Sequence, residues 1–324
     1  MIRLLRMITR LLHSAVVLLS LSSAFAQSGE KLGDVLRAAN VPTAAFSSAE
    51  LSGKITSYAA SDGDPFLLAY YDDNGSGELQ GPLRVIRYAR GGADVRRSAV
   101  RETSAVFEDS IETDCLGSVL QVLEREGLVF IDTHLNPSAG CVIVLSPNLE
   151  LKTAVSGWIL GFMGPDYAIF RRSEVHFMSV HPMRIVALDL KQNRAIDLYP
   201  YPGDSQRTRF SAAIEPLITG TWCTEYNAQC NPSNFDVELQ GELFINQRER
   251  VVGFQARFDA AGFGPAAEKR VPPRTVSYVF REREGRWEHR EFGPGELERT
   301  AGRVSFAELI QSKPDLAFQA TRNR

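Results

Sequence analysis

The sequence is poor in the residues that most often mark a catalytic or metal-binding protein. Its 324 residues include four cysteines, five histidines and three tryptophans. It contains no C-x-x-C pair, no G-x-S-x-G after a strand, no G-x-G-x-x-G and no phosphate-binding loop. These absences argue against a thiol redox centre, a structural zinc site, a serine nucleophile elbow and a nucleotide site.

A strong charge of either sign is also lacking. The net charge is −3 and 44% of the residues are hydrophobic, which is the composition of a globular protein. Without a basic excess, the chain has no electrostatic reason to bind nucleic acid. After residue 26 no apolar run is long enough to cross a membrane, so we expect no membrane span in the mature chain.

Residues 1–26 have the three parts of a secretory signal peptide. Arg3, Arg6 and Arg10 form a basic start, residues 11–21 are mostly apolar, and Ala24-Phe25-Ala26 is a small-x-small cleavage site. A transmembrane anchor is the alternative, but it needs roughly 20 apolar residues. The sequence therefore predicts cleavage after Ala26 and a secreted or periplasmic protein.

The four cysteines are an even number in a chain that we expect to be exported, which predicts two disulfides. Three pairings are possible. We expect Cys115–Cys141 and Cys223–Cys230, because these close the shortest loops.

Hydrophobic periodicity predicts one short N-terminal helix and then a β-rich chain. Leu32, Val35, Leu36 and Ala39 recur at helical spacing and form one apolar face, ending at Asn40. Beyond the helix, a weak repeat of strand, tight turn and strand occurs four times. These predicted hairpins span residues 83–101, 141–155, 184–199 and 275–292, and a further strand precedes each, at 66–71, 128–133, 174–180 and 251–258.

A strand-rich repeat of about 45 residues resembles the blades of β-propeller proteins. The resemblance is one of architecture, since no tryptophan–aspartate or kelch signature is present, and it implies an all-β array of about five blades. A β-sandwich or two small β domains is the alternative. The expected organisation is a signal peptide (1–26), a helix with a linker (27–58), a propeller-like domain (59–300) and a C-terminal tail (301–324).

One loop has part of a calcium-binding pattern. Asp72, Asn74 and Ser76 stand at positions 1, 3 and 5 of such a loop, but position 12, which should be a carboxylate, is Leu83. A turn made of residues that tolerate turn conformations explains the same pattern. We expect no cofactor, with calcium as the one alternative.

Catalytic candidates are the acids and histidines of strand-like segments, which in a propeller would converge on the central channel. Asp132 stands in a run that otherwise looks buried, and Glu174 and His176 share one face of a predicted strand. Weaker candidates of the same kind are His134, Asp166, His181 and Glu225. Ordinary edge acids and histidines at strand ends are the simpler interpretation.

The best binding candidate is the segment between Cys223 and Cys230. It places Trp222, Tyr226 and Asn227 in or beside a small disulfide loop, and aromatic and amide side chains suit recognition of a sugar or a protein. The sequence thus favours an exported, non-catalytic binding or scaffold protein for a protein or glycan ligand. The alternative is a hydrolase or lyase with carboxylates or histidines in the central channel.

Overall fold

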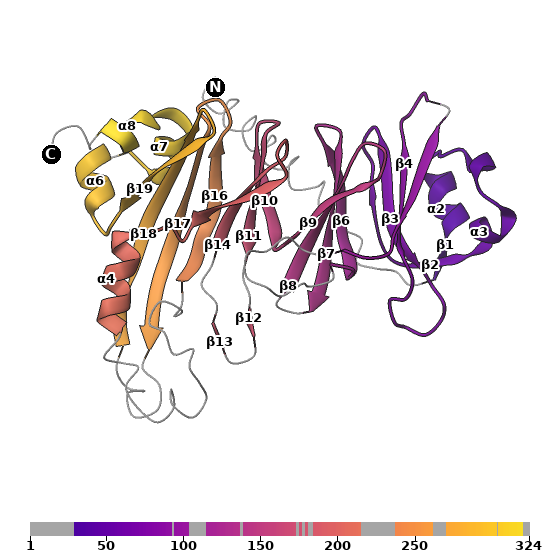
Figure 1. Cartoon of the computed structure of the whole chain (residues 1–324), viewed down its shortest axis with the longest axis horizontal. Coiled ribbons are helices and arrows are strands. Elements are labelled where there is room, and N and C mark those ends of the chain that lie inside the picture. Colours follow the sequence, from indigo (N-terminus) through magenta and orange to yellow (C-terminus); the bar gives the residue numbers. More distant parts are fainter. Residues whose placement is uncertain are drawn as a thin grey trace, which may run out of the picture. The chain divides into compact units, whose positions relative to one another are not determined.

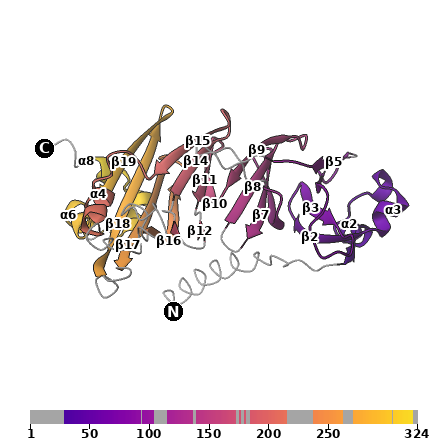
Figure 2. The same cartoon turned by 60° about the horizontal axis from the view of Figure 1, so that its bottom comes forward.

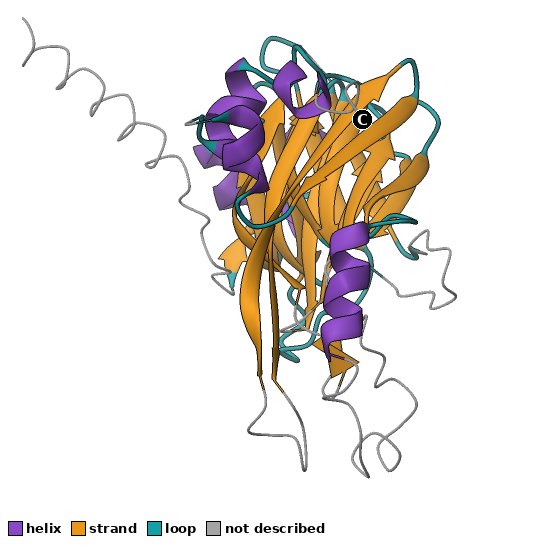
Figure 3. Ribbon diagram, turned by 90° about the vertical axis from the view of Figure 1, so that its left-hand side faces the viewer, coloured by secondary structure: helices purple, strands orange, loops and turns teal. Residues whose placement is uncertain are grey.

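The computed structural model describes residues 29–92, 94–103, 115–136, 139–172, 175–176, 179–180, 184–214, 237–261, 270–302 and 304–319. These residues form two compact units. Unit 1 takes its described residues from Met1–Thr103, Leu116–His134 and Ile143–Leu151, and unit 2 from Ser104–Cys115, Leu135–Val142 and Lys152–Arg324. Strands predominate in the described chain, with short helices between or after them (Figure 3).

The strands form four larger antiparallel sheets, each built from strands in the order of the chain (Figure 1). The first sheet contains β1 (Glu30–Lys31), β2 (Lys54–Ser61), β3 (Phe66–Asp72), β4 (Leu83–Tyr88) and β5 (Val95–Val100). The second contains β6 (Ser118–Arg125), β7 (Leu128–Asn136), β8 (Ala139–Leu145) and β9 (Leu151–Ser156), and is divided between the two units.

Unit 2 holds the other two large sheets, which can be followed in a second view (Figure 2). One is made of β10 (Trp158–Met163), β11 (Tyr167–Arg172), β14 (Arg184–Asp189) and β15 (Arg194–Tyr199), with the small pair β12 (Val175–His176) and β13 (Ser179–Val180) inserted between β11 and β14. The other is made of β16 (Val237–Asn246), β17 (Val251–Ala261), β18 (Arg270–Arg283) and β19 (Arg286–Phe292).

These sheets confirm the predicted all-β class and the four predicted hairpins, which are β4–β5, β8–β9, β14–β15 and β18–β19. Among the described residues the sheets form no closed ring of blades and no barrel, so the propeller stays a prediction. One predicted strand is wrong. The strand before the third hairpin is β11 rather than residues 174–180, because β11 pairs with β14 along its whole length.

Each large sheet contains an irregular strand that the sequence pattern did not predict, which is the first strand in three sheets and the second, after the short β1, in the first sheet. The register shifts between Thr56 and Ala59 in β2, Val119 and Gln121 in β6, Ile159 and Gly161 in β10, and Gln240 and Phe244 in β16. A bulge adds a residue to one strand and bends it. The shared irregularity supports the predicted repeat and raises its strand number from three to four.

The predicted N-terminal helix is confirmed as α2 (Leu32–Ala38). It stops because Asn40 takes a left-handed conformation with φ 57°, and the Val41 amide donates to the Leu36 carbonyl at 2.9 Å. With α3 (Ser48–Ser52), α2 packs on one face of the first sheet. Their shared core comprises Leu32, Leu36, Val41, Phe46, Ile55, Phe66, Leu68, Tyr70 and Ile86.

The core of unit 2 lies between the facing sides of its two large sheets. Ile169 and Ile185 on one sheet, and Phe254 and Tyr278 on the other, are all fully buried. Helix α4 (Ser205–Ile214) adds Phe210 to this core. Helices α6 (Glu296–Ala301), α7 (Phe306–Ser312) and α8 (Asp315–Gln319) follow β19, and they share a second core with the opposite side of the last sheet.

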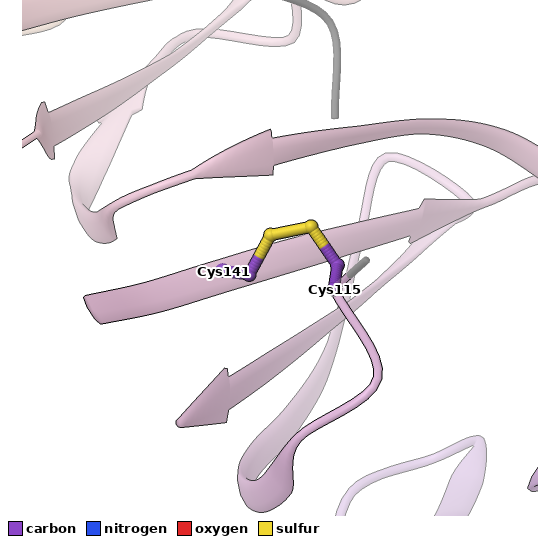
Figure 4. Close-up of a disulfide and its surroundings, with 2 residues drawn as sticks. All are labelled: Cys115 and Cys141. Atoms are coloured by element: carbon purple, nitrogen blue, oxygen red, sulfur yellow. A yellow bond between two sulfur atoms is a disulfide. The ribbon is translucent and has the colours of Figure 1, made fainter. Parts of the chain in front are cut away.

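Cys115 and Cys141 form a disulfide, as the sequence predicted (Figure 4). Their Cα atoms are 5.4 Å apart and both residues are completely buried. The other predicted pair, Cys223–Cys230, lies outside the described residues. Among the described residues, no helix combines the length and the apolar character needed to span a bilayer.

We expect replacement of Leu36 by Ala to lower the free energy of unfolding by about 2–5 kcal/mol, because its side chain is completely buried beneath the first sheet. Leu79→Ala is the control, since Leu79 is 36% exposed and its loss should change stability by less than about 0.5 kcal/mol. Urea unfolding of both variants measures the difference. Equal effects would show that α2 does not pack as described.

Loss of the Cys115–Cys141 bond should cost about 2–5 kcal/mol of stability. The double variant Cys115→Ala/Cys141→Ala removes the bond and keeps small side chains at two buried positions. Its melting temperature should be lower than that of the oxidised parent. Peptide mapping without reduction gives the pairing directly, and a Cys115–Cys223 peptide would contradict it.

Candidate functional site

Asp132 is the one predicted catalytic candidate whose surroundings are unusual. It lies in β7 opposite Gln121 of β6, next to the bulge in β6. Its Oδ1 atom is buried and has no hydrogen-bond partner among the described residues. Burial raises the pKa of the Asp132 carboxyl to about 7. A general acid or base can have these properties, but no second group is seen to act with it in the described part of unit 1.

The side-chain oxygen atoms of the predicted calcium loop accept hydrogen bonds from the loop itself and from the strand that follows it. Asn74 Oδ1 accepts hydrogen bonds from the amide and the hydroxyl of Ser76, at 2.9 and 2.7 Å. Asp72 Oδ2 accepts from Arg84 Nε at 2.6 Å. These contacts are those of a polar turn. Among the described residues, no group of three or more His, Cys, Asp or Glu side chains is placed to hold a metal ion. Calcium therefore stays an untested alternative.

The other predicted site residues are not brought together in the described chain. The backbone of His176 pairs with Ser179 in the small ladder of β12 and β13. Asp166 binds Arg250 NH1 at 2.8 Å and Lys191 Nζ at 2.5 Å, and both partners lower the pKa of its carboxyl, Lys191 more than Arg250. It is therefore part of an ion-pair network between turns. Glu174, His181, Trp222, Tyr226, Asn227 and Glu225 lie outside the described residues.

Unit 2 contains a cluster of tyrosines and carboxylates that the sequence analysis missed. We call it the tyrosine–carboxylate cluster, and it consists of Tyr199, Tyr201, Asp204, Tyr278 and Glu291. The first three belong to the segment from the end of β15 to the start of α4, whereas Tyr278 lies in β18 and Glu291 opposite it in β19. Close packing of these two parts of the chain creates the cluster.

The inner half of the cluster is centred on Asp204, which is 3% exposed. Its Oδ2 accepts the Tyr278 hydroxyl at 2.8 Å, and its Oδ1 accepts the amides of Gln206 and Arg207 at 2.9 and 3.0 Å. Asp204 is thus the N-terminal cap of α4. Burial raises the pKa of the Asp204 carboxyl, and the hydrogen bonds from Arg207, Tyr278 and Gln206 only partly offset this effect.

The outer half is centred on Glu291. Its Oε2 accepts the Tyr201 hydroxyl at 2.5 Å and its Oε1 accepts the Ser205 hydroxyl at 3.0 Å. Burial opposes ionisation of Glu291, but the hydrogen bonds from Tyr201 and Ser205 outweigh it and lower the pKa of its carboxyl. The exposed His289 lies two residues earlier on the same strand, and its ring stacks on Tyr201 with centroids 3.8 Å apart.

The two carboxyls therefore have pKa values shifted in opposite directions, which is the pattern of an acid–base pair. Their hydrogen bonds, however, all end within the protein. Every carboxylate oxygen of Asp204 and Glu291 accepts at least one bond from the chain. These bonds hold the start of α4 and the segment before it against the last sheet.

Comparison with known proteins adds no assignment. No family model matches the chain, and no curated protein or solved structure matches it. Functional inference therefore depends on the residues of this chain alone.

The raised pKa of Asp132 predicts a pH-dependent loss of stability. The carboxyl has a pKa of about 7 in the folded chain and near 3.9 when unfolded, so the folded state holds the proton more tightly. The contribution of Asp132 to the free energy of unfolding should be greatest below about pH 4, fall as the pH rises towards 7, and then level off. Asp132→Asn should remove this dependence and add up to about 4 kcal/mol at pH 8.

Urea unfolding from pH 4 to pH 8 tests this, with Asp62→Asn as a control at an exposed acid. The control should keep the pH dependence of the parent. If Asp132→Asn keeps it as well, Asp132 is not the group responsible.

Proposed function

We propose that the protein is an exported, non-catalytic binding protein, built on a propeller-like array of four- and five-stranded sheets, whose ligand is a glycan or another protein. The observation that carries this proposal is the closed tyrosine–carboxylate cluster. It brings together three tyrosines and two carboxylates in the described part of unit 2, and every oxygen of the two carboxylates accepts a hydrogen bond from the protein's own chain. The most enzyme-like feature of the fold thus has a structural use.

Two further observations are compatible with this proposal. A disulfide at Cys115–Cys141 suits a protein that folds in an oxidising compartment, outside the cytoplasm. Repeated antiparallel sheets, each built from strands that follow one another in the chain, suit the support of binding loops. Neither observation identifies the ligand.

A hydrolase or lyase is the second candidate, and one observation favours it. Asp204 and Glu291 have pKa values shifted in opposite directions, and Glu291 and its neighbour Tyr201 are only partly buried. A substrate that displaced the Tyr201 hydroxyl would meet an ionised Glu291 with the exposed His289 beside it.

The two candidates differ in what happens to the ligand. We expect the ¹⁵N spectrum of the protein to shift saturably with a member of a panel of oligosaccharides and peptides, and that compound to be recovered unchanged after prolonged incubation. Mass spectrometry of the compound measures turnover. Conversion that is lost in Glu291→Gln but kept in Glu284→Gln, a control at an exposed turn, would overturn the binding proposal and establish the enzyme.

A further inference from the structure

Unit 1 carries a groove of ≈ 420 Å³ on the first sheet. It lies on the face that α2 and α3 cover in part. Its floor includes Tyr70 of β3 and Ile86 of β4, and its sides include Arg84 of β4 and Arg97 of β5. Arg84 is directly opposite Tyr70 in the sheet, and Arg97 is opposite Ile86. The groove is at the small end of the range of about 300–1,000 Å³ that ligand sites usually have.

The hydroxyl of Tyr70 is the unexplained polar group of this groove. Tyr70 is 3% exposed and no hydrogen bond to its hydroxyl occurs among the described residues, but the hydroxyl oxygen is not one of the atoms that are cut off from water. Burial raises the pKa of Tyr70 to about 12, so the hydroxyl keeps its proton and is a donor as well as an acceptor. The hydroxyl is therefore open to the groove, where water is its partner in the free protein. A ligand in the groove would take the place of that water.

Two ion pairs flank the hydroxyl, and their charges balance. Arg84 Nε binds Asp72 Oδ2 at 2.6 Å. On the other side the Arg97 guanidinium binds Glu50, donates to the Ala45 carbonyl at 2.8 Å and lies 4.6 Å above the ring centre of Phe46. All four charged groups act electrostatically on the Tyr70 hydroxyl, the arginines with one sign and the carboxylates with the other.

This balance decides between classes of ligand. An anion would be attracted only weakly, because both arginines already have carboxylate partners. A cation would be repelled by the two guanidinium groups. A neutral molecule with neighbouring hydroxyls fits better, because each hydroxyl both donates and accepts. Each guanidinium has five N–H donors and keeps several for a ligand, and the second oxygen of Asp72 is an acceptor beside them.

We propose that the groove between Tyr70, Arg84 and Arg97 binds a neutral saccharide. The proposal rests on the binding function proposed above and names the class of its ligand. The sugar's hydroxyls would bond to Tyr70 and to the outer atoms of the Arg84–Asp72 pair, with its C–H groups against Ile86 and Ala99.

The test is a titration of the full chain with the methyl glycosides of glucose, galactose, mannose and N-acetylglucosamine. Binding is measured from the shifts of the ¹⁵N-labelled amide signals. Glucuronic and galacturonic acid are the acidic counterparts. We expect at least one neutral sugar to shift the amides of residues 84–86 and 97–99. Tyr70→Phe, which removes only the hydroxyl, should weaken that binding by about 3- to 10-fold. Tyr88→Phe, on the same strand face but not among the groove residues, should leave it unchanged.

Each other outcome has a definite meaning. Tighter binding of the acidic sugars would overturn the argument from charge balance. Shifts confined to other residues, or none in the groove with any sugar, would overturn the groove assignment and leave the binding function to be met by another surface. Conversion of a bound sugar to product would instead overturn the non-catalytic function. Equal weakening by Tyr70→Phe and Tyr88→Phe would show that the Tyr70 hydroxyl makes no contact with the ligand.

Discussion

Burial of one apolar sheet face against a second layer is the constraint on which the rest of this structure depends. An antiparallel sheet with an apolar face is unstable until that face is covered. In unit 2 the cover is a second sheet, and aromatic rings such as Phe254 and Tyr278 fill the space between the two. In unit 1 the cover on the first sheet is the helix pair α2 and α3. Both polar features discussed above adjoin these covered faces.

The position of each polar feature follows from this packing. The tyrosine–carboxylate cluster forms beside Tyr278, which belongs to the unit 2 core. Tyr278 lies in β18, and the neighbouring strand β19 is more polar. The groove of unit 1 has Tyr70 and Ile86, two residues of the helix-covered core, in its floor. Polar chemistry in this fold therefore lies at the margins of its cores, where a buried aromatic ring and a charged side chain meet.

The sequence pattern predicted the parts of the fold that depend on neighbouring residues. The tight turns, the hairpins and the end of α2 at Asn40 are local, and the pattern placed them well. Four strands were missed because a bulge interrupts the alternation of apolar and polar residues that marks a strand, namely β2, β6, β10 and β16. The strand β11 was missed because almost all its residues are buried, so that no alternation is visible.

The sites were less predictable, for a different reason. The alternation around Asp132 signalled a buried acid, and its raised pKa agrees with that signal. The sequence signal for the tyrosine–carboxylate cluster is weaker. It is the run of tyrosine and proline that ends in the helix cap Asp204. Nothing in that run indicates Tyr278 or Glu291, more than 70 residues further along the chain. The charged neighbours of Tyr70 were hidden similarly, since Glu50 and Arg97, which form an ion pair, are 47 residues apart in the chain.

The order of strands within the sheets has a consequence for how the chain can fold. In each large sheet, successive strands pair with the strand before and the strand after, and only the short β12–β13 hairpin interrupts the sequence. Such pairings close short loops and form quickly, in contrast to sheets that wait for a distant partner. A chain emerging from a ribosome or a membrane pore can therefore complete its hydrogen bonds one sheet at a time.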